Sequence, residues 1–233
     1  MWGGGDWLTK NPPAYPSNHY SQGWFMTQAL AGFNEHGIVL ATDSRATRFD
    51  VDGQPEVFSV NKLFALNRRC GILSGGAGVS VSLSLALRRQ IARHAGPLEL
   101  EEMEEFALPL LSQGYSRHLE THGPEAEGFR RIYFILAGYV PDSPPPHFKM
   151  ILLGSEENEL PLRRMLTGNV LVMPRNLGME MRLFKALSQG ADLEEILHLS
   201  QDFLEKMAAI KEEVGPPFHY ATITSRGYQP VIL

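Results

Sequence analysis

The side chains best suited to chemistry lie where an apolar segment near the start of the chain ends. Residues 38–41 read IVLA, which predicts a strand buried on both faces, and Asp43, Ser44 and Arg45 follow almost at once. Burying an unpaired charge is costly, so the carboxylate and the guanidinium need partners close by. They form either a structural ion pair where the strand reaches the surface or part of a functional site.

Other residue types carry weaker signals. The eight histidines show no metal-ligand spacing such as HExxH, and we predict no metal and no other cofactor. The segment SGGAG at 74–78 lacks the spaced Gly-Lys-Ser/Thr of a phosphate-binding loop, which argues against nucleotide binding. Cys70, the single cysteine, is predicted to contribute to packing rather than to act as a nucleophile.

Three segments together carry a resemblance to a known family. They read TQALAGFNEHGIVLATDSRAT from residue 27, VNKLFAL from residue 60 and GILSGGAG from residue 71. In order and spacing they resemble the proteasome β-subunit family, which includes the bacterial heat-shock-locus V peptidase and the Anbu peptidases. The resemblance is strong over residues 27–95, weaker over 190–228, where VGPP looks most like the Anbu branch, and slight between them.

The resemblance implies roles for individual residues. Thr27 matches the catalytic threonine and lies sixteen residues before Asp43, as the threonine of the family lies before its catalytic aspartate. Arg45 follows Asp43 by two residues, also as the family does. Lys62 matches the catalytic lysine, displaced by about three extra residues in a predicted loop at 48–58. Gly75 matches the glycine whose backbone N–H serves the oxyanion hole.

The chemistry of such a site can also be argued from the groups themselves. A threonine hydroxyl is a weak nucleophile that needs a base. If Thr27 is the first residue, its own α-amine, with a pKa of roughly 7.7–8.0, can take and return the proton. Lys62, anchored by Asp43, would favour the deprotonated amine and the developing alkoxide, and the N–H of Gly75 would stabilise the oxyanion. Taken alone, Lys62 would be interpreted as an ordinary surface lysine.

The scheme requires removal of residues 1–26, so that Thr27 has a free amine. This segment holds all three tryptophans and shows no helical or strand periodicity, which predicts a removable leader or a disordered extension. Two routes of removal are open: self-cleavage at the Met26–Thr27 bond, or translation from Met26 followed by methionine removal. Self-processed family members usually carry glycine before the threonine, so Met26 favours the second route. Residues 27–233 are predicted to form a single domain.

Two departures from the family concern support for the amine. The family commonly places an aspartate and a serine before its closing glycine turn, whereas residues 211–215 read KEEVG. Its GSGS-like turn is also missing near residues 167–169. We therefore assign no residue to the support of the amine.

Periodicity and turn signals predict the elements that must position these groups. Strands are predicted at 27–34, 37–44, 62–67, 70–76, 130–140, 147–156 and, as a pair about Arg226–Gly227, at 220–233. Helices are predicted at 77–95, 98–119 and 177–188, and from Asp192, with Glu195 as its capping-box partner. Clustered strands between helix pairs predict an α+β fold. The resemblance makes this a four-layer αββα sandwich of two antiparallel sheets, the N-terminal-nucleophile hydrolase fold.

Three of the predicted helices carry apolar stripes that should face a core. In the segment 77–95, Val79, Val81, Leu83 and Leu85 alternate as in a strand, but Val79, Leu83, Leu87 and Ile91 form a stripe at helical spacing, and the length of the segment favours a helix. The stripe of the helix at 98–119 consists of Leu100, Met103, Phe106, Leu110 and Leu111. The stripe of the last helix consists of Ile196, Leu199, Phe203, Met207 and Ile210.

Bulk properties exclude several classes of protein. With 233 residues, 43% of them hydrophobic, and a net charge of −5, the chain is typical of a globular protein that does not bind nucleic acid. No apolar run approaches the roughly 18 residues of a membrane span. A single cysteine and the lack of a signal-peptide pattern predict a reducing compartment and a cytoplasmic location.

The resemblance implies a threonine endopeptidase that hydrolyses peptides or unfolded polypeptides through an acyl-enzyme on Thr27. It also implies a homo-oligomeric ring or spiral with enclosed sites, and leaves room for an ATP-dependent unfoldase as a partner. Two alternatives stay open. One is a non-catalytic structural subunit of a proteasome-like assembly that keeps residues 1–26; the other is an N-terminal-nucleophile amidohydrolase acting on a small amide. The cleavage preference is not predicted, because the pocket walls lie partly in poorly matched segments.

Overall fold

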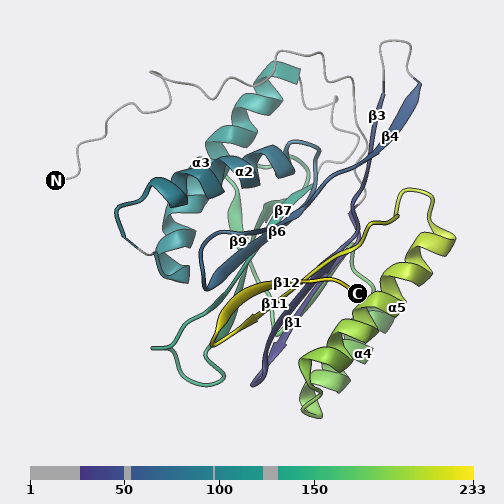
Figure 1. Cartoon of the computed structure of the whole chain (residues 1–233). Helices are drawn as coiled ribbons and strands as arrows, with labels where there is room; N and C mark the ends of the chain where they lie inside the picture. Colours follow the sequence, from purple (N-terminus) through teal and green to yellow (C-terminus); the bar gives the residue numbers. More distant parts are fainter. Residues whose placement is uncertain (1–26, 50–53, 97, 123–130) are drawn as a thin grey trace.

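The computed structural model describes residues 27–49, 54–96, 98–122 and 131–233 (Figure 1). The predicted leader at 1–26 and the turn at Asp52–Gly53 lie outside these residues. Along the described chain, strands are followed by a helix pair, more strands, a second helix pair and two last strands. All of the strand pairings within it are antiparallel. The prediction of an α+β fold with antiparallel sheets is confirmed.

One sheet of the described residues has the strand order β10-β1-β2-β11-β12. Its strands are β1 (Ala29–Asn34), β2 (Gly37–Thr42), β10 (Val170–Met173), β11 (His219–Thr224) and β12 (Gly227–Val231). β2 lies between β1 and β11 and is buried along its whole length, which confirms the prediction of a central strand. In the register of the sheet, Thr42 lies between Ala29 and His219. The ends of these strands therefore meet just before Asp43.

A second sheet has the strand order β5-β6-β7-β8-β9. Its strands are β5 (Leu63–Ala65), β6 (Cys70–Gly76), β7 (Ile132–Tyr139), β8 (Phe148–Ser155) and β9 (Arg163–Met165). In the register of β6 and β7, Gly75 lies opposite Tyr133. Lys62 comes directly before β5, and the N–H of Ser74 donates to its carbonyl at 3.0 Å, so the start of β5 is held against the end of β6.

A separate two-stranded ribbon leads from one sheet to the other. It consists of β3 (Arg45–Phe49) and β4 (Pro55–Ser59), paired from Arg45 opposite Ser59 to Phe49 opposite Pro55. The prediction of a loop at 48–58 is therefore wrong at both ends of this range, where residues 48–49 belong to β3 and residues 55–58 to β4. The polar composition suggested a loop, but backbone ladder hydrogen bonds form whether or not the side chains are exposed, and Val57 remains 53% exposed within β4.

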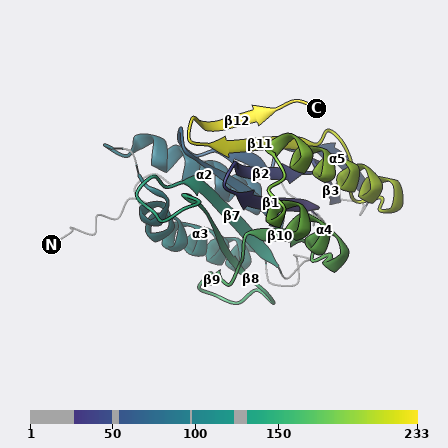
Figure 2. The same cartoon turned by 90° about the horizontal axis from the view of Figure 1, so that it is seen from below.

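Two helix pairs lie on opposite sides of the strands (Figures 1 and 2). They are α2 (Ser80–Arg93) with α3 (Leu100–His122), and α4 (Leu177–Ser188) with α5 (Leu193–Ile210). One apolar cluster joins α2 and α3 to the β5–β9 sheet, through side chains such as Leu111 and Phe134. Another joins α4 and α5 to the other sheet, through Leu30 and Leu183. A third contains side chains of both sheets, so the sheets also pack against each other.

The helix boundaries were predicted more accurately than the residues on the buried faces of the helices. The Asp192 side chain accepts the N–H of Glu195 at 2.9 Å, as the capping pattern predicts. Ile210, however, is 66% exposed at the end of α5. In α3 the buried line runs through Leu100, Met103, Ala107, Leu111 and Tyr115, whereas Phe106 and Leu110 are only partly buried. Ala107 rather than Phe106 continues the line because it lies four residues from both Met103 and Leu111.

The described residues contain no helix with the length and apolar character that a bilayer span requires.

Candidate active site

The site begins where the β1–β2 ladder continues past the end of β2. The N–H of Asp43 donates to the carbonyl of Gln28 at 3.1 Å, and the N–H of Gln28 donates to Asp43 Oδ1 at 3.0 Å. Gln28 directly follows Thr27, so this reciprocal pair of hydrogen bonds fixes the Asp43 carboxylate one residue from the threonine. Alternation along β1 gives Thr27 the side-chain direction of Ala29 and Ala31, which lie in the cluster between the sheets.

Lys62 and Asp43 form a buried ion pair beside this point. Lys62 Nζ lies 2.9 Å from Asp43 Oδ1, and the two side chains are 1% and 0% exposed. The ammonium also donates to the carbonyl of Arg45 at 2.9 Å, and Asp43 Oδ2 accepts the N–H of Arg45 at 3.1 Å. The interpretation of Lys62 as a surface lysine is therefore wrong. The carboxylate does not reach the surface either, and its charged partner is Lys62, not Arg45.

Burial shifts the protonation equilibria of both members of the pair. Loss of water around the carboxyl raises the pKa of Asp43, against the opposing effect of the Lys62 charge and hydrogen bond. The same loss lowers the pKa of Lys62, against the opposing effect of Asp43. Lys62 therefore releases a proton more readily than a solvated lysine, and its charge acts in a region poor in water.

Thr27, Gly75 and Tyr133 form a tight contact on the other side of the threonine. The Tyr133 hydroxyl donates to the carbonyl of Thr27 at 3.3 Å. A Cβ atom added to Gly75 would lie 2.8 Å from Thr27 Cβ and 2.6 Å from Tyr133 Cζ. Only glycine lets the end of β6 come this close to the threonine. The end of β6 therefore lies directly against the Thr27 side chain.

Arg45 is placed differently from the other predicted residues. Its guanidinium donates to the carbonyl of Glu212, and its side chain packs on Gly215, where an added Cβ would lie 3.3 Å from Arg45 Cδ. The N–H of Ser44 donates to the carbonyl of Gly215 at 3.2 Å. Arg45 therefore ties the end of β2 to the closing segment 212–215 and positions Asp43 through its backbone.

Some side chains at the site have no counterpart in the sequence-based prediction. His219 lies next to Thr42 in the register and alternates with Ala221 and Ile223, so it shares the face between the sheets with Thr27. Partial burial and the Lys62 charge lower the pKa of His219, with Asp43 opposing. The alternation of residues 219–223 could have predicted that His219 faces the other sheet. No sequence pattern could have predicted the position of Tyr133, because it lies in a uniformly apolar strand.

Two buried serine hydroxyls near the ion pair add unused hydrogen-bonding capacity. Ser44 follows Asp43 and Ser74 precedes Gly75, and both are 0% exposed. Neither Oγ atom has a hydrogen-bond partner among the described residues. Unpaired buried hydroxyls are costly. The register pairs Ser74 with Phe134, which places Ser74 on the face of the sheet that packs against α2 and α3 rather than on the face of Thr27.

The described residues bring together no group of three or more His, Cys, Asp or Glu side chains that could hold a metal ion. Cys70 lies in the cluster beneath α2 and α3, and burial raises its pKa to about 12. A thiol of this kind is not ionised near neutral pH and is a poor nucleophile. The threonine-centred group is thus the best candidate for chemistry among the described residues.

No model of a known protein family matches the chain, and no curated protein matches it.

Proposed function

We propose that the chain is a threonine peptidase that hydrolyses peptide bonds through an acyl-enzyme on Thr27. The observation that carries the proposal is the shared oxygen Asp43 Oδ1, which accepts both the N–H of Gln28 at 3.0 Å and Lys62 Nζ at 2.9 Å. A buried ammonium is thereby held close to the backbone that directly follows Thr27, and Gly75 lies against the Thr27 side chain.

The reaction uses groups that this chain supplies. The free amine of Thr27 takes the hydroxyl proton as the oxygen attacks a peptide carbonyl, and the Gly75 N–H stabilises the oxyanion. The same amine returns the proton to the leaving nitrogen, which leaves an ester on Thr27. Water then hydrolyses the ester by the reverse sequence of proton transfers. Lys62 favours the neutral amine and the developing alkoxide throughout.

The arrangement of layers supports the proposed family. The clusters described above join a helix pair to each sheet and the sheets to each other. This pattern fits the four-layer αββα sandwich of N-terminal-nucleophile hydrolases such as the proteasome β subunits. It supports residues 27–233 as one domain, whose site lies where the sheets meet.

The proposal extends to assembly and location. The exposed side of α4 carries Leu177, Met181 and Phe184, which are 61%, 64% and 55% exposed. Their spacing of four and three residues places them on one helix face, which supports a homo-oligomeric ring or spiral. Peptides or unfolded polypeptides are the proposed substrates, with an ATP-dependent unfoldase as an optional partner. The proposed location is the cytoplasm, because a single cysteine permits no intrachain disulfide.

The test compares chains that differ only at the threonine. A chain produced with Thr27 as its first residue should hydrolyse a panel of fluorogenic peptides, and Thr27→Ala should abolish turnover. Thr167→Ala, which changes a threonine in the loop before β10, is the matched control and should keep full turnover. A folded chain that begins at Thr27 and cleaves no peptide would contradict the proposal. Turnover of small amides alone would favour the amidohydrolase, and no turnover at all the structural subunit.

A further inference from the structure

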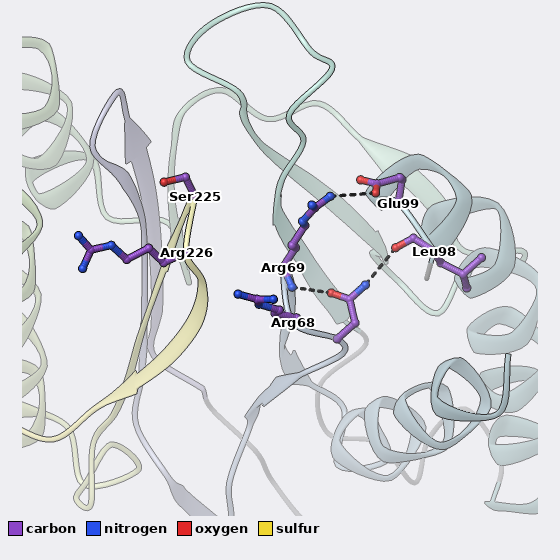
Figure 3. Close-up of a pocket in the computed structure, with 7 residues that line it drawn as sticks. Arg68, Arg69, Leu98, Glu99, Ser225 and Arg226 are labelled. Carbon is purple, nitrogen blue, oxygen red and sulfur yellow. Dashed lines mark hydrogen bonds and ion pairs between the residues drawn. The ribbon is translucent and has the colours of Figure 1, made fainter. Parts of the chain in front are cut away.

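A cavity of about 360 Å³ lies far from the candidate active site (Figure 3). It is surrounded by the β5–β6 turn at 67–69, residues 98–99 before α3, and the β11–β12 turn at 225–226. Thr27 lies at the end of the sheet where β11 starts, whereas the turn at 225–226 follows the end of β11. The cavity is therefore about 20 Å, one strand length, from the threonine.

The walls of the cavity are held by backbone hydrogen bonds. Asn67 Oδ1 accepts the N–H groups of Arg69 and Cys70, both at 2.8 Å, and its Nδ2 donates to the carbonyl of Leu98 at 3.0 Å. The N–H of Tyr228 donates to the carbonyl of Arg68 at 2.8 Å. These bonds tie the turn of one sheet to the turn of the other and to the segment before α3.

A glycine makes the contact between the two turns possible. Gly227 has a φ of +116°, and a Cβ atom there would collide with the carbonyl oxygen of Arg68. The close approach is therefore built into the sequence at this point. The backbone walls of the cavity are therefore formed before any ligand arrives, which lowers the cost of binding.

The charges around the cavity are strongly unbalanced. The lining holds three arginines, Arg68, Arg69 and Arg226, and one carboxylate, Glu99, which gives a local charge of +2 in a chain whose net charge is −5. Arg69 Nη1 lies 3.3 Å from Glu99 Oε1. Within the described part of the chain, the side chains of Arg68 and Arg226 have no hydrogen-bond or ion-pair partner. The carbonyls of Arg68 and Leu98 are already occupied by N–H donors, so these walls offer mainly donors.

We propose that this cavity binds a small molecule through a phosphate or carboxylate group. Arg68 and Arg226 supply charged donors, and the Ser225 hydroxyl supplies a neutral one. In Figure 3 Arg69 reaches toward Glu99, while Arg226 extends away from it, so rotation of the long Arg226 side chain accompanies binding. Guanidinium groups bind such oxyanions with two parallel hydrogen bonds, and the volume suits a compact ligand. A bound anion bridges the two sheets.

The experiment measures the thermal unfolding of the full chain with added inorganic phosphate or citrate, at an ionic strength kept constant with sodium chloride. A ligand that binds only the folded state raises the unfolding temperature as its concentration rises. We expect such a rise for at least one anion: phosphate alone indicates phosphorylated ligands, citrate alone indicates polycarboxylates, and both indicate a general oxyanion site. Arg68→Gln with Arg226→Gln should remove the rise.

The matched control is Arg163→Gln with Arg175→Gln, which removes the same charge from two exposed arginines elsewhere. The control should keep the full response, and far-ultraviolet circular dichroism should show both double variants folded. Isothermal titration of R68Q and R226Q singly gives a second measure, with weaker binding expected in each. The proposal is overturned if neither anion raises the unfolding temperature of the unmodified chain, or if the cavity and control variants respond alike.

Discussion

At the scale of single residues, the proposed mechanism depends on the ion pair between Asp43 and Lys62, which is buried away from water. Asp43 accepts hydrogen bonds from the backbone of Gln28 and Arg45 as well as from Lys62. Such a pair adds little net stability, because the desolvation cost offsets the attraction. The proposed chemical role next to Thr27 gives a reason for this ion pair that stability alone does not give.

Removing one partner should be costly, and removing both much less so. We expect Lys62→Met to lower the free energy of unfolding by about 3–5 kcal/mol, because it leaves a buried carboxylate unpaired. Adding Asp43→Leu should restore part of that loss while peptide turnover stays absent. Urea unfolding and peptide hydrolysis measure the two effects, with the exposed Arg163→Gln as control. A Lys62→Met chain as stable and active as the control would contradict this assignment.

Gly75 should tolerate no side chain. Gly75→Ala would place a methyl group 2.8 Å from Thr27 Cβ, so the threonine or Tyr133 must move. We expect a loss of about 1–3 kcal/mol in the free energy of unfolding, as for other overpacked positions, together with loss of turnover. Gly96→Ala is the control, because an added Cβ there meets nothing within 4 Å. Equal behaviour of the two variants would show that the predicted contact is absent.

His219 should make stability depend on pH. Its pKa is held below the ordinary 6.5, so the unfolded chain takes up the proton first as the pH falls. The free energy of unfolding should therefore be highest above pH 6.5 and decrease as the pH drops from 6.5 toward the lowered pKa.

His219→Asn should flatten the pH dependence in that window, as measured by urea unfolding at a series of pH values. His198→Asn, which changes an exposed histidine of α5, is the control. Identical curves for His219→Asn and the unmodified chain would contradict the electrostatic placement of His219.

At the scale of elements, α4 has one face buried in the core and an exposed apolar face, which is the surface proposed for assembly. Leu183 faces the sheet, while Met181 and Phe184 are exposed. We expect Met181→Glu with Phe184→Glu to reduce the assembled mass measured by light scattering, because charges would enter the proposed apolar contact. Arg182→Glu with Lys185→Glu changes exposed neighbours on the same helix and should have a smaller effect. An unmodified chain that is monomeric would contradict the proposed assembly.

The secondary-structure elements show which features of the fold could be predicted from the sequence. Local signals predicted the β1–β2 hairpin, the cap at Asp192 and the bounds of α4, because turn and cap chemistry act within a few residues. The opposition of Tyr133 to Gly75 and the hydrogen bond from Tyr133 to Thr27 depend on pairing between distant strands. Such register is set by tertiary packing and leaves no local mark in an apolar strand. The β3–β4 ribbon was not predicted, because the polar composition of exposed strands resembles that of loops.

The candidate site was predictable only in part. Asp43 and Arg45 stand out as charges after a buried strand, whereas Lys62 and Gly75 were found through the resemblance alone. In the structure Thr27, Asp43, Lys62 and Gly75 lie close together, whereas the Arg45 side chain contacts the segment 212–215. Burial of Lys62 could not be read from its surroundings, since an isolated lysine in sequence is usually exposed.

At the scale of the whole molecule, the two sheets meet so that the end of one supplies Thr27 and Asp43 and the end of the other supplies Lys62 and Gly75. Packing of the two sheets is thus a condition for the proposed chemistry. In the full chain, however, the Thr27 nitrogen belongs to the Met26–Thr27 peptide bond and cannot act as a base.

The proposal that the α-amine of Thr27 acts as the base is therefore tested most directly by identifying the first residue of the chains that hydrolyse peptides. Intact-mass analysis of the active fraction should give a chain that begins at Thr27, whichever route removes residues 1–26. A chain that still begins at Met1 and hydrolyses peptides at the full rate would show that some other group supplies the base.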